Sequence, residues 1–174
     1  PADRGGELLS QVDSPGFGFD SKYNSTARFE FRSDKVLAGE TVLPRTRLVY
    51  SLSAAPVRWL GRVSVDGSVG EEIDFVGARR GHGGRAAGSV VVRPGDHLDL
   101  DFVGEIQWMN VKPEGESGSK RLFTAFVERL KATYTLTARS YVRVIGQYVE
   151  ARANPELYAE PVEERSGSFS ASAL

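Results

Sequence analysis

The chain has 174 residues, enough for one domain, and its formal net charge of −1 gives no basic excess that would indicate nucleic-acid binding. It contains no cysteine, which excludes disulfide frameworks and thiolate metal sites. No apolar run approaches the roughly 18 residues that a membrane-spanning helix needs. Membrane-spanning strands are still compatible with this composition, because apolar and polar residues alternate along them and their hydropathy averages out.

The order of predicted elements begins with a loop or linker at residues 1–23, which are rich in Gly, Ser, Asp and Pro. From residue 24 to residue 174, apolar and polar side chains alternate in separate stretches. A period of two indicates β-strands, because successive side chains of a strand point to opposite faces. The predicted strands are 27–33, 45–53, 57–66, 84–93, 97–108, 121–134 and 139–150, and an eighth begins at 167–174.

The predicted connections after residue 44 alternate between short and long. Short turns fall near residues 54, 94 and 136, and long polar connections are predicted at 67–83, 109–120 and 151–166, after an earlier one at 34–44. Outer-membrane β-barrels have short turns at one end and longer loops at the other. The sequence therefore predicts an all-β fold: an antiparallel up-and-down meander of seven or eight strands that forms part of a transmembrane β-barrel, without any long helix between residues 84 and 150.

The alternation divides the strand side chains between an apolar face, expected to contact lipid, and a charged face, expected to line the barrel lumen. In a water-soluble protein the same faces would be core and solvated surface. The apolar set is Phe29, Phe31, Leu48, Tyr50, Leu52, Trp59, Val63, Val90, Val92, Leu98, Leu100, Phe102, Ile106, Val142 and Val144. The lumen-facing candidates are Arg58, Arg62, Arg85, His97, Asp99, Asp101, Glu105, Arg129, Lys131, Arg143 and Gln147, joined by Arg28, Arg32 and Arg47.

Aromatic residues near the predicted strand ends are candidates for the interfacial girdles of a barrel, with sugar stacking as the alternative. They are Tyr50, Trp59, Trp108, Tyr134 and Tyr148. Glu128 is the exception on its strand, because it falls on the same row as apolar residues. A charge facing lipid is costly, so this position requires either a β-bulge that shifts the register or a protein cover over the face.

Two patterns could carry chemistry. Residues 81–84 read Gly-His-Gly-Gly, as in the oxyanion loops of esterases, but no G-x-S-x-G motif accompanies them, so a flexible loop tip is favoured. Asp99 and Asp101 share a face beside His97 and could bind a cation or act in acid–base chemistry. Pairing with arginines of neighbouring strands is the favoured interpretation. The sequence thus predicts no catalytic residue, metal site or cofactor.

Several segments resemble the C-terminal half of an uncharacterised bacterial family of outer-membrane β-barrels that carry an N-terminal domain similar to family-nine carbohydrate-binding modules. The segments are 70–84, 93–102, 121–150 (with Arg143, Gln147 and Tyr148) and 166–174, and the resemblance spans roughly residues 46–174. It implies the outer membrane of a Gram-negative bacterium as location and the lipid bilayer as partner. It also implies a role as pore, scaffold or anchor for a carbohydrate-binding protein, with carbohydrate bound through the N-terminal domain. Some members are labelled hydrolases, but no motif in this chain carries such an activity.

The alternative interpretation is a water-soluble β-sandwich or barrel domain that binds a ligand on its sheet face. Under the barrel interpretation, family members continue beyond the position of Leu174 with a final hairpin, so the segment is expected to be truncated within a strand. We also expect Arg143 and Gln147 on the concave side of the sheet and Val144 on the convex side. The isolated chain is then expected to aggregate or to require detergent, because its apolar rows and strand edges would be exposed to water.

Overall fold

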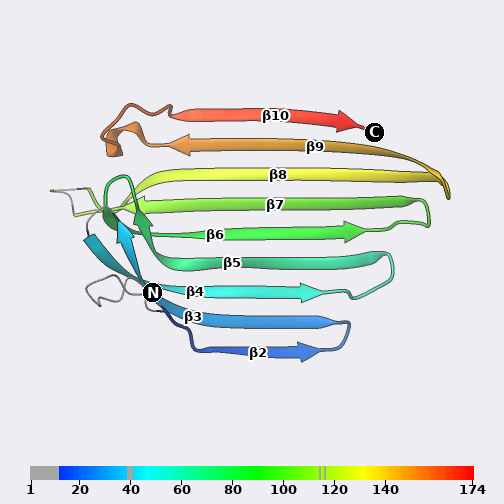
Figure 1. Cartoon of the computed structure of the whole chain (residues 1–174), viewed down its shortest axis with the longest axis horizontal. Helices are drawn as coiled ribbons and strands as arrows, with labels where there is room; N and C mark the ends of the chain where they lie inside the picture. Colours follow the sequence, from blue (N-terminus) through cyan, green and yellow to red (C-terminus); the bar gives the residue numbers. More distant parts are fainter. Residues whose placement is uncertain (1–11, 39–40, 114, 116) are drawn as a thin grey trace, which may run out of the picture.

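The computed structural model describes residues 12–38, 41–113, 115 and 117–174, which fold into one open antiparallel β-sheet (Figure 1). Its strands are β1 (Val12–Asp13), β2 (Gly16–Ser21), β3 (Ser25–Ala38), β4 (Thr41–Ala54), β5 (Leu60–Asp74), β6 (Arg79–Val92), β7 (Leu98–Val111), β8 (Lys120–Thr137), β9 (Ser140–Ala153) and β10 (Arg165–Ala173). From β3 to β10, each strand pairs with its neighbours in the chain, and β1 and β2 both pair with β3. The predicted all-β meander is confirmed, and β3 to β10 correspond to the eight predicted strands.

The strands are longer than the sequence predicted, with 14 residues in β3 and β4 and 18 in β8. The connections predicted at 34–44 and 67–83 are wrong, because most of these residues continue the ladders of β3 with β4 and of β5 with β6. Their polar, Gly-rich composition is typical of loops, which explains the error. Residues 39–40 lie outside the described part of the chain. The connection between β5 and β6 is reduced to 75–78.

The loop predicted at 1–23 is also wrong for β1 and β2, while residues 1–11 lie outside the described ranges. β2 pairs along half of β3, and the rings of Phe17 and Phe29 stack with centroids 5.3 Å apart. Small residues on both sides of Phe17 and Phe19 gave the segment a loop-like composition. The two phenylalanines nevertheless follow the period of two, and they lie on the same face as Phe29.

The connections gather by position at the two ends of the sheet (Figure 1). One end, here called the turn end, holds 22–24, 55–59, 93–97 and 138–139; the other, the loop end, holds 75–78, 112–119 and 154–164. β5 begins at Leu60 and not at the predicted Val57, because a turn closed by the Leu60 N–H donating to the Val57 carbonyl at 3.1 Å occupies this segment. The predicted alternation of short and long connections therefore fails at 75–78, although 112–119 and 154–164 are long.

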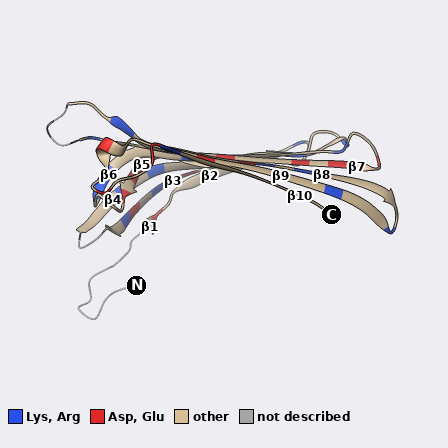
Figure 2. Ribbon diagram, turned by 90° about the horizontal axis from the view of Figure 1, so that it is seen from above, with Lys and Arg blue, Asp and Glu red and all other residues tan. Residues whose placement is uncertain are grey.

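The molecule has a single layer, which Figure 2 shows edge-on. Few apolar residues of the described ranges are buried, namely Ala38, Ile73, Met109, Val111 and Leu122. The last three form a cluster at the loop end, where Leu157 and Tyr158 of the β9–β10 connection pack against them. The 3-10 turn Pro155–Leu157 within this connection is pinned by Arg79, whose Nη2 donates to the Leu157 carbonyl at 2.7 Å. No helix among the described residues is long and apolar enough to span a bilayer.

The register defines two faces, because residues directly opposite each other in an antiparallel ladder share a face. The apolar face contains Phe29, Phe31, Leu48, Tyr50, Leu52, Val63, Val90, Val92, Leu98, Leu100, Phe102, Ile106, Val142 and Val144, all of them expected there. It also contains Val65, Val69, Trp108, Phe126, Leu130, Tyr134, Tyr148 and Phe169. Trp59 is the exception, since it lies in the turn before β5. The opposite side is the charged face.

Aromatic side chains on the apolar face lie over glycines of the neighbouring strand. An added Cβ at Gly84 would lie 2.6 Å from the Ser68 carbonyl oxygen and 2.8 Å from the Trp108 ring. Gly88 lies on the same strand and the same face, but the nearest atom to an added Cβ there is 3.8 Å away. Gly84 is therefore needed for close packing, whereas Gly88 is not.

We expect Gly84→Ala to lower the free energy of unfolding by about 1–3 kcal/mol through overpacking. Gly88→Ala is the matched control and should be neutral or stabilising by about 0.5 kcal/mol, because alanine restricts the unfolded chain. Urea titration of both variants measures the difference. Equal destabilisation by the two substitutions would contradict the packing of Trp108 on Gly84.

Candidate functional site

The charged face holds nine of the eleven lumen-facing candidates. These are Arg62, Arg85, Asp99, Asp101, Glu105, Arg129, Lys131, Arg143 and Gln147. Arg58 and His97 do not belong to strands and lie in turns at the turn end, where His97 Nδ1 is 2.8 Å from the Thr135 carbonyl oxygen. The face also carries Arg28, Arg32 and Arg47. That it lines a lumen stays a prediction.

Acidic and basic side chains on this face pair between adjacent strands. Arg85 donates two hydrogen bonds to Glu105, at 2.6 and 2.7 Å, and lies 3.7 Å from Asp66. Lys131 Nζ donates to Asp101 at 2.7 Å. Both pairs are partly exposed, so each contributes only about 0–1 kcal/mol to stability. They keep carboxylates and cations in fixed rows along the middle of the face.

Some basic residues of the charged face lack an acidic partner among the described residues. Arg62 and Arg129 make no ion pair there, and Arg143 instead donates from Nε to the Thr133 hydroxyl at 3.3 Å. The Arg143 guanidinium also lies over the Tyr141 ring, 5.1 Å from its centroid. The β8–β9 part of this face therefore carries uncompensated positive charge, which would attract anions from solution.

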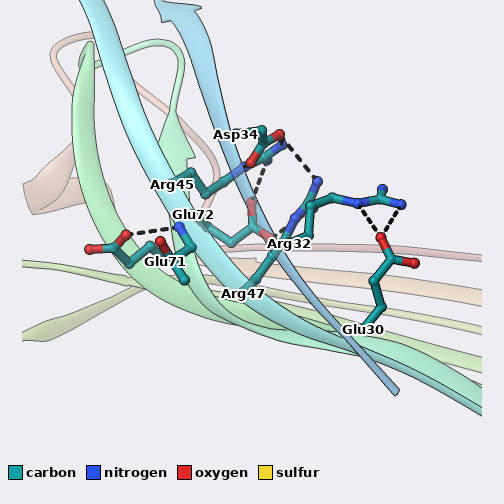
Figure 3. A network of polar contacts seen from close by, with 8 residues as sticks. Glu30, Arg32, Asp34, Arg45, Arg47, Glu71 and Glu72 are labelled. Atoms are coloured by element: carbon teal, nitrogen blue, oxygen red, sulfur yellow. Dashed lines mark hydrogen bonds and ion pairs between the residues drawn. The ribbon is translucent and has the colours of Figure 1, made fainter. Parts of the chain in front are cut away.

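An ion-pair cluster at the loop end was missed by the sequence analysis (Figure 3). Arg45 donates to both carboxylate oxygens of Asp34, at 3.1 and 2.6 Å, and to Glu72 at 3.1 Å. Arg47 adds longer contacts, 3.7 Å to Asp34 and 3.5 Å to Glu72. The hydrogen bonds from Arg45 lower the pKa of Asp34, so its carboxylate stays ionised. The cluster joins β3, β4 and β5 where they extend beyond the apolar part of the sheet.

The signal for this cluster was present in the sequence, because Arg45 and Arg47 alternate on the charged face of β4. Asp34 and Glu72, however, fell within stretches interpreted as connections. Arg45 lies directly opposite Asp34 in the β3–β4 ladder. The hairpin register, continued past the last apolar pair, would have placed the two charges together.

Many large side chains of the apolar face are exposed, and the others are half-buried. The exposed ones range from 37% for Tyr148 to 71% for Phe169, and they occur on β2 to β5 and on β7 to β10. Among the residues that the structure describes, no second sheet and no helix covers them. A soluble domain buries such a face against another layer. The described part of the chain leaves this face uncovered.

The apolar residues form an oblique band across the sheet. At the turn end, a register row runs from Ala54 on β4, its last strand residue, through Phe102 to Leu130 on β8. On β8 the band continues six residues further, to Leu136. The boundary thus shifts by six residues over the four steps from β4 to β8, or about 1.5 residues per strand. With a rise of about 3.3 Å per residue and a spacing of about 4.8 Å between strands, this shift corresponds to a strand tilt of about 45° relative to the normal of the boundary.

The opposite boundary of the band drifts in the same direction. The row that contains Leu48 on β4 and Trp108 on β7 reaches Arg152 on β9. On β9 the band has already ended at Tyr148, four residues closer to the turn end. Most apolar-face positions beyond this boundary are polar, among them Ser33, Thr46, Glu71, His82, Asn110, Thr124, Glu150, Arg152 and Arg165. Leu37, Val42 and Ile73 are the apolar exceptions on β3, β4 and β5.

Glu128 lies on the apolar face, opposite Gly104 on one side and Tyr148 on the other. The bulge in β8 lies at Leu122 and does not change this, so of the two alternatives left open by the sequence, a bulge does not account for Glu128. No described residue covers it. The band ends at Phe126 on β8, only two residues from Glu128, because its boundary is oblique. On β9 the band ends at Tyr148, which lies directly opposite Glu128. The carboxylate is therefore close to the edge of the band.

Beyond the band, Glu150 anchors a second ion-pair cluster. Its side chain is 7% exposed and accepts hydrogen bonds from the Tyr148 hydroxyl at 2.6 Å and from Arg152 Nε at 2.5 Å, with Arg165 Nε at 3.0 Å. These donors, the Tyr148 hydroxyl first, lower the pKa of Glu150 from 4.5 to about 2. The cluster ties the start of β10 to β9.

We expect the Glu150 cluster to make stability depend on pH. A carboxyl whose pKa is lowered by folding stabilises the protein fully above pH 4.5, and this stabilisation is lost as the pH falls toward 2. Glu150→Gln should therefore melt below the wild-type protein at pH 7, and the difference in Tm should shrink toward pH 2. Melting curves between pH 2 and 7 test this. A difference in Tm that does not change with pH would contradict it.

The aromatic girdle candidates occupy different levels. Trp108 and Tyr148 end the band toward the loop end, whereas Tyr134 and Trp59 lie toward the turn end. Tyr50 lies inside the band, where its hydroxyl would be 2.7 Å from a Cβ added at Gly67. Four of the five candidates therefore lie toward one or the other end of the band, and Tyr50 lies between them; that they form girdles stays a prediction.

The other candidate chemistries find no assembled site. Residues 81–84 are not a loop tip but part of β6, paired on both sides. Asp99 accepts a hydrogen bond at 2.8 Å from Nε of Arg93 in the β6–β7 turn, and Asp101 accepts one from Lys131 of β8. Both carboxylates therefore pair with basic side chains, although neither partner is an arginine of a neighbouring strand as favoured from the sequence. Within the described ranges, no three acidic or histidine side chains are close enough to hold a metal ion.

Comparisons of the chain with protein-family models, curated proteins and solved structures find no match. The resemblance to the outer-membrane family therefore stays a prediction.

Proposed function

We propose that this chain supplies strands to a transmembrane β-barrel of a Gram-negative outer membrane, with the apolar face in lipid and the charged face toward a water-filled interior. The oblique apolar band carries this proposal. Strands of outer-membrane barrels tilt by about 35–45°, and the drift of the turn-end boundary of the band corresponds to about that angle, with a smaller drift in the same direction at the loop end. The apolar stretch of β7, from Leu98 to Trp108, matches the 9–11 residues that a tilted strand needs to cross a bilayer.

The polar ends of the strands support the same proposal. Beyond the band, β3 to β6 continue as paired strands and carry the Asp34–Arg45–Glu72 cluster toward the loop end. Strands that project beyond the hydrocarbon into water can be charged on both faces. At the turn end the band reaches the short connections directly. We therefore assign the loop end to the extracellular side and the turn end to the periplasm, since long loops are extracellular in such barrels.

The interior of the proposed barrel contains fixed ion pairs and the uncompensated cations Arg62, Arg129 and Arg143. Side chains of this kind suit a pore or a scaffold, and they provide no assembled catalytic group. An anchoring role for a carbohydrate-binding protein rests on the sequence resemblance. A β-sandwich in water would need a second sheet from outside the described residues.

Vesicle flotation tests the proposal. The chain, unfolded in urea, is diluted into phosphatidylcholine vesicles and centrifuged in a density gradient. We expect it to float with the lipid, to resist extraction by alkaline carbonate, and to show a β-sheet circular dichroism spectrum. A monodisperse monomer that melts cooperatively without detergent or lipid would refute the membrane proposal.

A further inference from the structure

The edge formed by β10 is the second surface of the sheet that lacks a partner among the described residues. β10 pairs with β9 along its whole length, and all nine of its residues are exposed. The N–H of Leu174 donates to the Arg143 carbonyl, and the N–H of Arg143 donates to Leu174, both at 2.9 Å. Because bonding alternates along an antiparallel strand, residues 166, 168, 170 and 172 also face β9. The backbone N–H groups of Gly167, Phe169, Ala171 and Ala173 therefore point to the open edge.

This edge has none of the devices that usually block strand addition. Exposed edges are normally interrupted by lysine, proline or a bulge. β10 has no charge or proline after Arg165, and its register with β9 contains no bulge. The opposite edge differs, since Ser14 and Pro15 divide it into the short strands β1 and β2. β10 thus offers an uninterrupted row of free donors and acceptors.

We propose that the β10 edge binds an antiparallel β-strand whose apolar residues align with Phe169, Ala171 and Ala173, and whose small or polar residues align with the serines. The apolar side of the incoming strand would extend the apolar face, and the polar side the charged face. Only this alternation continues both faces. This proposal deepens the proposed function. The side-chain pattern of the incoming strand rests on the membrane assignment, whereas the backbone pairing does not depend on it.

The strand directions exclude β2 as the antiparallel partner. β2 and β10 point the same way in Figure 1, because eight antiparallel steps separate them. Closing the sheet on itself would therefore require a parallel pair. A second copy with the same orientation in the membrane presents the same β2 edge and meets the same obstacle. An all-antiparallel ring, as in bacterial barrels, needs an odd number of additional strands.

The test uses a fluorescent peptide with the sequence of β9, Ser140–Ala153, which already pairs antiparallel with β10 from the other side. Binding to the whole chain is measured by anisotropy in detergent micelles. We expect saturable binding that Ala171→Pro weakens at least about tenfold, because proline removes an outward N–H and its ring obstructs the edge. Ala171→Val keeps the N–H and should bind as the wild type does.

Proline at an edge position leaves the bonds to β9 in place, and amide exchange of the Ser170 N–H checks this. Ala173→Pro provides a second outward position should Ala171→Pro unfold the ladder. Absent binding, or equal binding by the proline and wild-type chains, would overturn the proposal. Self-association lost in Ala171→Pro, without peptide binding, would overturn it in favour of a second copy. Vesicle flotation of the same variants is measured separately, so that a failure of the membrane proposal can be distinguished from a failure of strand addition at the β10 edge.

Discussion

Leu130→Arg should destabilise the vesicle-embedded protein by about 2–4 kcal/mol, the cost of an arginine facing the middle of a bilayer. Leu130 lies on the apolar face of β8, within the band and opposite Phe102 and Gly146, and it is 48% exposed. Equilibrium unfolding in urea, followed by tryptophan fluorescence in phosphatidylcholine vesicles, measures the change. The chain has two tryptophans, Trp59 and Trp108, so no probe needs to be added.

Val127→Arg is the matched control. Val127 is three residues away on the same strand and similarly exposed at 39%, but it lies on the charged face opposite Glu105. An arginine there would meet water and a carboxylate, so its effect should stay within about 0.5 kcal/mol, as for most surface substitutions. If the apolar face met water, both substitutions would be surface changes of similar size. Equal effects would therefore contradict the lipid assignment.

Arg45→Ala should lower the free energy of unfolding by about 2 kcal/mol, between the cost of losing an exposed pair and that of breaking a buried one, because this pair is partly buried. The side chains of Arg45 and Asp34 are 13% and 11% exposed, and removing the guanidinium leaves the Asp34 and Glu72 carboxylates without their main partner. The cluster joins β3, β4 and β5, so all three strands should lose protection against amide exchange at the loop end. Urea titration combined with amide exchange measures both effects.

Arg32→Ala serves as the control for this prediction. Arg32 pairs with Glu30 on the same face, but both side chains are more than 30% exposed. The loss of such a pair costs only about 0–1 kcal/mol. A double-mutant cycle with Asp34→Ala then isolates the coupling of Arg45 to Asp34. If Arg45→Ala and Arg32→Ala were equally mild, the Arg45 cluster would have no special role in holding the strand extensions.

The sequence by itself determined the two faces and the order of the strands. The direction of a strand side chain depends only on its position in the period of two, so Leu98 to Trp108 could be divided between faces without knowledge of their partners. Short turns such as 93–97 join neighbouring antiparallel strands, which made the meander predictable. The same local rule placed the candidate charges of β6 to β9 together on one face.

Only the tertiary structure decided how far the strands extend and how they are offset. Asp34 and Glu72 look like loop residues in the sequence, because nothing local compensates their charges; the compensation comes from Arg45 on the adjacent strand β4. The oblique band also depends on which residues face each other across each ladder. That register is set by turns and by bulges at Gly61, Leu122 and Leu136. Alternation within one strand is unchanged when the whole strand shifts by two residues relative to its neighbours. The sequence therefore shows which face Glu128 lies on, but only the assembled sheet shows how close Glu128 is to the edge of the apolar band.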